Sequence, residues 1–136
     1  MTDNLVTFLR ARLDEDEQAA RAATPGPWTV DSETYAAAIH GAGHADVIAG
    51  GRWGGEASVF ESTEDALHIV RHDPPRVLAE VAAKRRILDQ HRGLESMTGP
   101  NCSTCCIESW PCPTLRLLAL PYANHPDYRP EWAPGA

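Results

Sequence analysis

Hydrophobic residues recur at intervals of three and four from Asp3 to about Ala23. Such intervals place side chains on one face of a helix, so this stretch predicts an amphipathic helix. Its expected core face consists of Leu5, Phe8, Leu9 and Leu13. The acidic run over residues 14–17 is typical of a solvated helix face, and we assign it no function.

Turn residues then replace the helical pattern. The segment 24–28, Thr-Pro-Gly-Pro-Trp, ends the helix because neither proline can donate a helical hydrogen bond. Three short apolar or β-branched runs follow, separated by polar and glycine-containing turns, at Trp28–Val30, Tyr35–Ile39 and Asp46–Ala49. These runs predict a small antiparallel sheet, to which residues 57–60 would add an edge strand.

A pair of helices is expected next. Residues 62–65 resemble a capping box and predict a short helix over 63–72. A second helix should start at Asp73-Pro74, because Asp73 can cap its N-terminus and Pro74 is tolerated in its first turn. This helix runs to about His91, and its apolar stripe places His91 on the core side.

All four cysteines lie within residues 102–112. A short helix should begin at Pro113 and end near Pro121, followed by an irregular tail in which Tyr128 and Trp132 fold back onto the protein. The whole pattern predicts an α+β fold. Its expected order is an N-terminal helix, a small antiparallel sheet, a helix pair, a cysteine loop and a short C-terminal helix.

Length and composition fit one globular domain. The chain has 136 residues, of which 43% are hydrophobic and 23% charged. We expect a single domain over 1–136. Residues 1–92 would form the scaffold of helices and sheet, and residues 93–136 would form the cysteine loop, the short helix and the irregular tail.

The charge of the chain bears on its partners and its location. There are 12 basic and 19 acidic residues, a net charge of -7, and the cations are scattered. This disfavours nucleic acid as a partner, whereas an acidic surface suits a basic protein. The N-terminus lacks the layout of a signal peptide, and no apolar run approaches the roughly 18 residues of a membrane helix. We therefore expect a cytoplasmic protein with no membrane association.

The spacing of the cysteines indicates a metal site. Cys102 and Cys105 can bind one tetrahedral ion from a single tight turn, and Cys112 supplies a third thiolate. In a reducing cytoplasm such a cluster favours metal over disulfides. We expect one structural zinc ion, so that the cysteine loop is a zinc knuckle; an iron–sulfur cluster, disulfides and metal-free thiols are the alternatives.

Three residues compete for the fourth ligand position: His91, His125 and Cys106. We prefer His91, because it ends a helix on the buried side and the glycines after it allow the chain to turn back. Cys106 ranks last because adjacent residues rarely both point at one ion. Three cysteines and one histidine leave no position for a water nucleophile, so the zinc is expected to fold the loop rather than to catalyse.

A second candidate site consists of His68, His72 and Asp73. Two histidines four residues apart can chelate a metal from one helix face, but Ile69 stands where a metalloprotease motif has its glutamate. Capping and packing around the Asp73-Pro74 corner are the favoured roles. The sequence contains no phosphate-binding loop and no nucleophile elbow, so we assign no catalytic residue and do not expect an enzyme.

Several segments of the chain resemble one known family. They are Phe8–Glu17, Pro25–Trp28, His68–Pro74, Ala83–Leu88, Trp110–Arg116 and Tyr122–Tyr128. Together they resemble, over nearly the whole chain, an actinobacterial and actinophage family of domains of unknown function, number six-two-two-one. The front part is also similar to the Ea22-like small phage proteins. The resemblance implies an actinobacterial, phage-associated or prophage-associated setting, and it implies no activity.

These observations favour a non-enzymatic, zinc-stabilised accessory protein that binds another macromolecule, such as a phage-encoded host-interaction or anti-defence factor. The alternative is a binder of a small molecule or nucleotide that uses the region of Trp28, Trp53, His68 and His72. A metal-dependent hydrolase centred on His68, His72 and Asp73 ranks below both. A protein partner is expected and nucleic acid is not, while the oligomeric state is left open.

Overall fold

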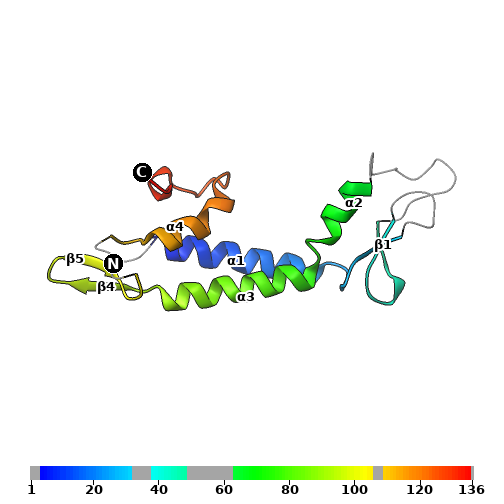
Figure 1. Cartoon of the computed structure of the whole chain (residues 1–136), viewed down its shortest axis with the longest axis horizontal. Helices are drawn as coiled ribbons and strands as arrows, with labels where there is room; N and C mark the ends of the chain where they lie inside the picture. Colours follow the sequence, from blue (N-terminus) through cyan, green and yellow to red (C-terminus); the bar gives the residue numbers. More distant parts are fainter. Residues whose placement is uncertain (1–3, 32–37, 49–62, 106–108, 136) are drawn as a thin grey trace. The chain divides into compact units, whose positions relative to one another are not determined.

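The computed structural model describes residues 4–31, 38–48, 63–105 and 109–135. Within them the elements follow the predicted α+β order, which confirms the fold class (Figure 1). The helices are α1 (Asn4–Ala22), α2 (Thr63–Val70), α3 (Pro74–Gln90) and α4 (Pro113–Ala119). The strands are β1 (Thr29–Asp31), β2 (Ala38–His40), β3 (Asp46–Ile48), β4 (Gly93–Ser96) and β5 (Gly99–Cys102). Short 3-10 turns are η1 (Ala42–His44), η2 (Leu120–Tyr122) and η3 (Pro130–Trp132).

The chain forms two compact units. Unit 1 is Met1–Glu15 with Val81–Ala136, and unit 2 is Asp16–Glu80. The boundaries between them fall within α1 and α3. The organisation into a single domain over 1–136 stays a prediction.

Unit 2 contains the three-stranded antiparallel sheet, in the order β1-β2-β3. Its apolar residues face one another across the strands, because Val30 pairs with Ile39 and Ile39 pairs with Ile48. Helix α2 packs against β1 and β2. Ile39 and Ala66 are fully buried, and they form the centre of this small core. The sheet expected from the short apolar runs is confirmed, and the edge strand expected at 57–60 lies outside the described residues.

Asp73 fixes the start of α3 and a turn far away in the sequence. Its Oδ1 accepts a hydrogen bond of 3.2 Å from the backbone N–H of Arg76, the capping bond expected of this residue. Its Oδ2 accepts one of 3.2 Å from the backbone N–H of Trp28. A Cβ atom at Gly26 would lie 2.5 Å from the ring of Pro75, so only glycine permits this approach. The corner therefore ties the Pro-Gly-Pro-Trp turn to α3.

In unit 1 the first turns of α1 lie antiparallel to the last turns of α3. Two ion pairs connect them, Arg10 with Asp89 at 3.5 Å and Arg85 with Asp14 at 2.6 Å. Exposed pairs of this kind each contribute less than about 1 kcal/mol, so apolar burial holds the helices together. The predicted core face of α1 is confirmed, because its members are at most 6% exposed: Leu5, Phe8, Leu9 and Leu13.

The C-terminal tail folds back onto α1, as expected. The ring of Trp132 is buried, and its centroid lies 5.1 Å from that of Phe8. The ring of Tyr128 lies 6.0 Å from that of Phe8. Helix α4 begins at Pro113, as predicted, but the chain does not stop turning at Pro121. It continues as η2, because a proline is tolerated in the first turn of a helix, where no N–H is needed.

The cysteine loop begins with a β-hairpin that the sequence did not predict. Strands β4 and β5 pair from Gly93 with Cys102 to Ser96 with Gly99. A two-residue turn joins them, and Gly99 has a φ of +118°, which favours glycine. The Ser96 hydroxyl donates a hydrogen bond of 2.6 Å to the Gly99 carbonyl. The hairpin escaped prediction because its strands are short and poor in β-branched residues.

Truncation of Trp132 tests the packing of the tail. Trp132→Ala removes a ring buried against Phe8 and should lower the free energy of unfolding by about 3–5 kcal/mol. Leu117→Ala is the matched control, because Leu117 is 56% exposed in the same unit. The control should change the free energy by less than about 0.5 kcal/mol. Denaturant titration measures both, and equally small losses would contradict the described packing.

Candidate metal centre

Four potential metal ligands converge at the base of the β4-β5 hairpin. His91 directly follows α3, Cys102 ends β5, Cys105 lies in the turn after β5, and Cys112 directly precedes α4. Their ligand atoms all lie within 4.8 Å of one another. Among the residues described, this is the one group of three or more His, Cys, Asp or Glu side chains that can hold a metal ion.

The His91 imidazole is almost equidistant from three sulfurs. Its Nδ1 lies 3.4 Å from the Cys102 sulfur, 3.3 Å from that of Cys105 and 3.5 Å from that of Cys112. One ring nitrogen cannot direct a single N–H at three acceptors, so these contacts are not a set of hydrogen bonds. In a tetrahedral zinc site with Zn–S of about 2.3 Å and Zn–N of about 2.0 Å, nitrogen and sulfur ligands lie about 3.5 Å apart. The residues therefore fit a Cys3His zinc ion.

Hydrogen bonds attach the cysteine turn to the end of α3. The backbone N–H of Ser103 donates to the Arg92 carbonyl at 2.8 Å. The hydroxyls of Ser103 and Thr104 both donate to the Gln90 carbonyl. Carbonyls at a helix C-terminus lack partners inside the helix, so these side chains satisfy one of them. The same bonds bring the turn that carries Cys105 next to His91.

The four potential ligands differ in their exposure to solvent. Cys102 and Cys112 are fully buried, whereas His91 and Cys105 are half-buried. All three described cysteines are free thiols. The cluster thus has two buried members that belong to the core of unit 1 and two that solvent can reach.

The two buried thiols ionise differently in the metal-free protein. Burial raises the pKa of Cys102, but hydrogen bonds from the backbone N–H groups of Cys105 and Thr104 outweigh it and lower the pKa from 9.0 to about 7. Burial raises the pKa of Cys112 to about 11, despite a hydrogen bond from the backbone N–H of Leu115. The sulfurs of Cys102 and Cys105 add to that rise. A divalent cation would favour the thiolate form of all three.

The competing fourth ligands lie elsewhere or outside the described residues. His125 belongs to a different cluster, since both its ring nitrogens lie within 2.7 Å of the Arg12 guanidinium. Its Nδ1 also accepts a hydrogen bond of 3.1 Å from the backbone N–H of Asp127. The geometry thus brings His91, and not His125, to the sulfurs. Cys106 lies outside the described residues.

The second candidate site does not come together around Asp73. His72 donates from Nδ1 to the His68 carbonyl at 2.9 Å, and the two rings lie 4.7 Å apart. Both oxygens of Asp73 are engaged by backbone N–H groups, as described above. In the described residues no group of three ligand atoms forms here. The capping role predicted for Asp73 accounts for one of its two hydrogen bonds, the one from Arg76.

The region proposed for a small-molecule binder is only partly described. The Trp28 indole N–H donates a hydrogen bond of 2.8 Å to the Thr24 carbonyl, so this ring is held by its own turn. Trp53 lies outside the described residues.

Sequence reasoning missed a buried arginine on α1. Arg12 is 8% exposed, its guanidinium donates to Glu15 at 2.8 Å, and it lies 5.1 Å from the centre of the Phe8 ring. The signal was available, because position 12 follows 5 and 8 at helical spacing and so lies on the core face.

The fold and the cluster together define a class: a small α+β protein with one histidine and three cysteines grouped at the base of a hairpin. The model of the Family of unknown function (DUF6221) matches residues 2–134, and the chain belongs to this family. No curated protein and no solved structure matches the chain. Among the described residues, no helix combines the length and the apolar character needed to span a membrane.

Replacement of two histidines tests the choice of the fourth ligand. His91→Ala removes one of four donors and should lower zinc affinity by more than the ~10–100-fold typical of lost outer-shell contacts. His125→Ala should leave the affinity unchanged, because that ring contacts Arg12 and Asp127. Competition with a chromophoric chelator measures both affinities. Loss of zinc in the His125 variant but not in the His91 variant would contradict this assignment.

Zinc binding should weaken as the pH falls. Cys112, with a pKa of about 11, is protonated at neutral pH in the metal-free protein and must lose its proton to bind. Cys102, with a pKa of about 7, becomes protonated as the pH drops below neutrality. Protons therefore compete with zinc for both thiols. Calorimetric titration at several pH values counts the protons released, and an affinity equal at about pH 6 and pH 8 would be incompatible with thiolate ligands.

Proposed function

We propose that the protein is a non-enzymatic accessory protein, stabilised by one structural zinc ion, that acts by binding another macromolecule. The observation that carries this proposal is the group of four protein donors around one point. Four protein ligands complete a tetrahedral zinc shell and leave no position for a reactive water. Such an ion would join the hairpin, α3 and α4, and its binding energy would contribute to folding.

The distribution of charge supports a basic partner. Asp16–Glu80 contains 11 acidic and four basic residues, whereas the rest of the chain contains eight of each. Unit 2 therefore accounts for the whole net charge of -7. A concentrated negative charge attracts cationic surfaces and speeds their association. It repels nucleic acid for the same reason.

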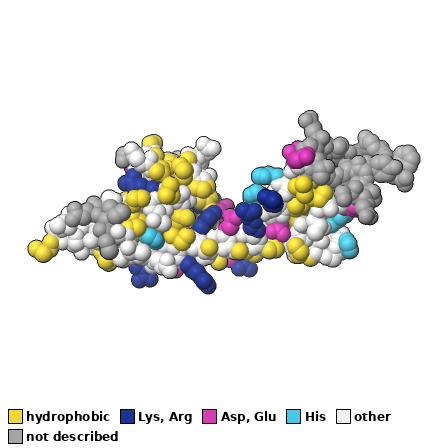
Figure 2. Space-filling model, in the orientation of Figure 1, with side chains coloured by type: hydrophobic (Ala, Val, Ile, Leu, Met, Phe, Trp, Pro, Cys, Tyr) yellow, Lys and Arg dark blue, Asp and Glu magenta, His cyan; other side chains and the backbone are white. Residues whose placement is uncertain are grey.

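Exposed apolar residues support a contact surface on unit 1. Leu117 on α4 is 56% exposed, and Leu120 just after it is 47% exposed. Hydrophobic side chains gather over α4 in Figure 2. Contiguous apolar surface of this kind is typical of sites that bind other proteins. The resemblance to an actinobacterial and actinophage family suggests the setting, a host-interaction or anti-defence factor acting in the cytoplasm.

Charge-neutralising variants test the proposal. Glu64 and Asp65 are exposed acidic residues in the first turn of α2, and Glu131 is an exposed acidic residue of unit 1. The double variant Glu64→Gln with Asp65→Asn should reduce retention of the partner by up to about fivefold per charge, since exposed charges contribute up to about 1 kcal/mol each. Glu131→Gln is the matched control and should have no effect. Retention is measured by quantitative mass spectrometry after affinity capture from an actinobacterial lysate.

Two outcomes of this capture would contradict the proposal. One is that no stoichiometric partner is recovered with zinc-loaded protein. The other is that a recovered partner is retained equally by the double variant and by wild type at every salt concentration, which would show that the acidic unit does not attract it.

A further inference from the structure

We propose that the outer edge of β4 binds an extended peptide segment of the partner by strand addition, with one apolar side chain of that segment in the cavity beside Trp110. This inference rests on the proposed function, because it names the kind of segment that a protein partner would present. Three observations carry it: the backbone groups on the strand edge, the adjacent cavity, and the charges at its ends.

The pairing of the hairpin determines which backbone groups face outward. The Ser103 N–H donates to the Arg92 carbonyl at 2.8 Å, so these two residues form a hydrogen-bonded pair. Hydrogen-bonded and non-bonded pairs alternate along an antiparallel ladder. The non-bonded pairs, whose N–H and C=O groups point away from the partner strand, are therefore Gly93 with Cys102 and Glu95 with Pro100.

The two outer edges of the hairpin differ in the backbone hydrogen-bonding groups that they present to a further strand. The β5 edge carries Pro100, which has no N–H and cannot complete a ladder. The β4 edge presents the N–H and C=O of Gly93 and of Glu95, and no hydrogen bond to these outward groups occurs within the described ranges. All four residues of β4 are exposed. An open edge of this kind is a template for another strand.

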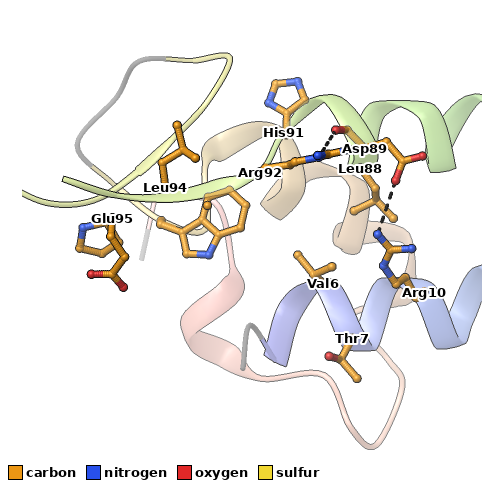
Figure 3. A pocket seen from close by; sticks show the side chains of 12 residues that line it. Val6, Thr7, Arg10, Leu88, Asp89, His91, Arg92, Leu94 and Glu95 are labelled. Carbon is orange, nitrogen blue, oxygen red and sulfur yellow. Dashed lines mark hydrogen bonds and ion pairs between the residues drawn. The ribbon is translucent and has the colours of Figure 1, made fainter. Parts of the chain in front are cut away.

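A cavity of about 550 Å³ lies against the hairpin, lined by Gly93 and Glu95 of β4 and by Pro100 of β5 (Figure 3). Its apolar lining includes Val6 of α1, Leu88 of α3 and Trp110. The indole of Trp110 lies directly against Gly93, since a Cβ atom there would come within 2.8 Å of the ring. A strand paired with β4 would project the side chain opposite Gly93 onto the same face, toward the indole. An apolar residue suits that position.

Two charged residues, Arg92 just before β4 and Glu95 within it, indicate which charges the bound peptide should carry on either side of its apolar residue. Arg92 donates from Nε to the Asp89 carbonyl at 2.9 Å, and its terminal nitrogens have no partner within the described part of the chain. Glu95 has no ion pair there either. In Figure 3 Leu94 and Glu95 point to opposite sides of β4, as strand alternation requires.

These charges also set the direction of the peptide. An antiparallel strand, the more stable arrangement, would place a residue near Glu95 first and a residue near Arg92 last. The complementary segment therefore reads basic, any residue, apolar, acidic. Its basic residue lies opposite Glu95, its apolar residue opposite Gly93 and its acidic residue opposite Arg92. Such charges contribute orientation and specificity more than affinity.

The probe for this site is the blocked peptide Thr-Lys-Val-Leu-Asp, added to the zinc-loaded full chain. Binding should slow hydrogen exchange of the Gly93 and Glu95 amides, measured by nuclear magnetic resonance. The reversed peptide Asp-Leu-Val-Lys-Thr has the same composition and should bind more weakly. A peptide N-methylated at its lysine and leucine should bind at least about tenfold more weakly, because two backbone hydrogen bonds are lost.

Variants of the protein test the same site independently of the peptide. Glu95→Pro removes the outward N–H but none of the bonds within the hairpin, and it should weaken binding at least about tenfold. Glu95→Gln keeps the N–H and removes the charge, so it should weaken binding by up to about fivefold. Zinc content and thermal unfolding check that both variants fold. Should Glu95→Pro not fold, the N-methylated peptide still tests the pairing, because it removes the bonds that the peptide N–H groups donate to the Gly93 and Glu95 carbonyls.

Several results would overturn the inference. They are no binding of the probe, equal binding of the N-methylated peptide, and equal binding to a folded Glu95→Pro variant. Concentration-dependent protection of the same amides without peptide would mean that a second copy occupies the edge, which also overturns it. If the lysate partner is captured while the probe does not bind, strand addition is wrong and the proposed function stands.

Discussion

Unit 1 brings three thiols and one imidazole nitrogen together at one place. These four groups come from the end of α3, the end of β5, the turn after it and the residue before α4, and their ligand atoms lie within 4.8 Å of one another. In the metal-free protein the two buried thiols differ, because burial raises the pKa of Cys112 to about 11, whereas backbone hydrogen bonds outweigh burial and lower that of Cys102 to about 7. A zinc ion would favour the thiolate form of all three cysteines and would act as a crosslink between the segments that carry them. Small units with limited cores commonly rely on such crosslinks.

Two residues of the peptide site inferred above lie close in sequence to these ligands. Gly93 follows His91 by two residues, and Trp110 precedes Cys112 by two. The indole lies against that glycine, so the aromatic wall of the cavity and the open edge of β4 meet at the metal site. A zinc ion that fixes the four ligands would also fix the position of this edge relative to α1 and α3. Under the proposed function, the ion would have no chemical role and would hold in place the surface that binds the partner.

The sequence predicted the helices and the ligands better than the backbone between them. Helical spacing marked Leu5, Phe8, Leu9 and Leu13, and all four are buried. The cysteine spacing and the apolar stripe of α3 pointed to a cluster with His91, which the structure assembles. The β4-β5 hairpin could not be predicted, because its order comes from the Gly99 turn and from hydrogen bonds to α3 rather than from a hydrophobic alternation. The contacts of Arg12 with Glu15 and His125 could not be predicted, because His125 is 113 residues away in the sequence and meets Arg12 only when the tail folds back.

X-ray absorption spectroscopy at the zinc edge, on protein purified without added metal, would identify the ligands of a bound ion. We expect about one zinc ion per chain, with three sulfur ligands at about 2.3 Å and one nitrogen at about 2.0–2.1 Å. A folded protein that contains no metal would show that the four side chains are not a structural zinc site. So would a zinc shell that contains oxygen ligands, because an open position occupied by water would make the site a candidate for catalysis rather than a structural crosslink.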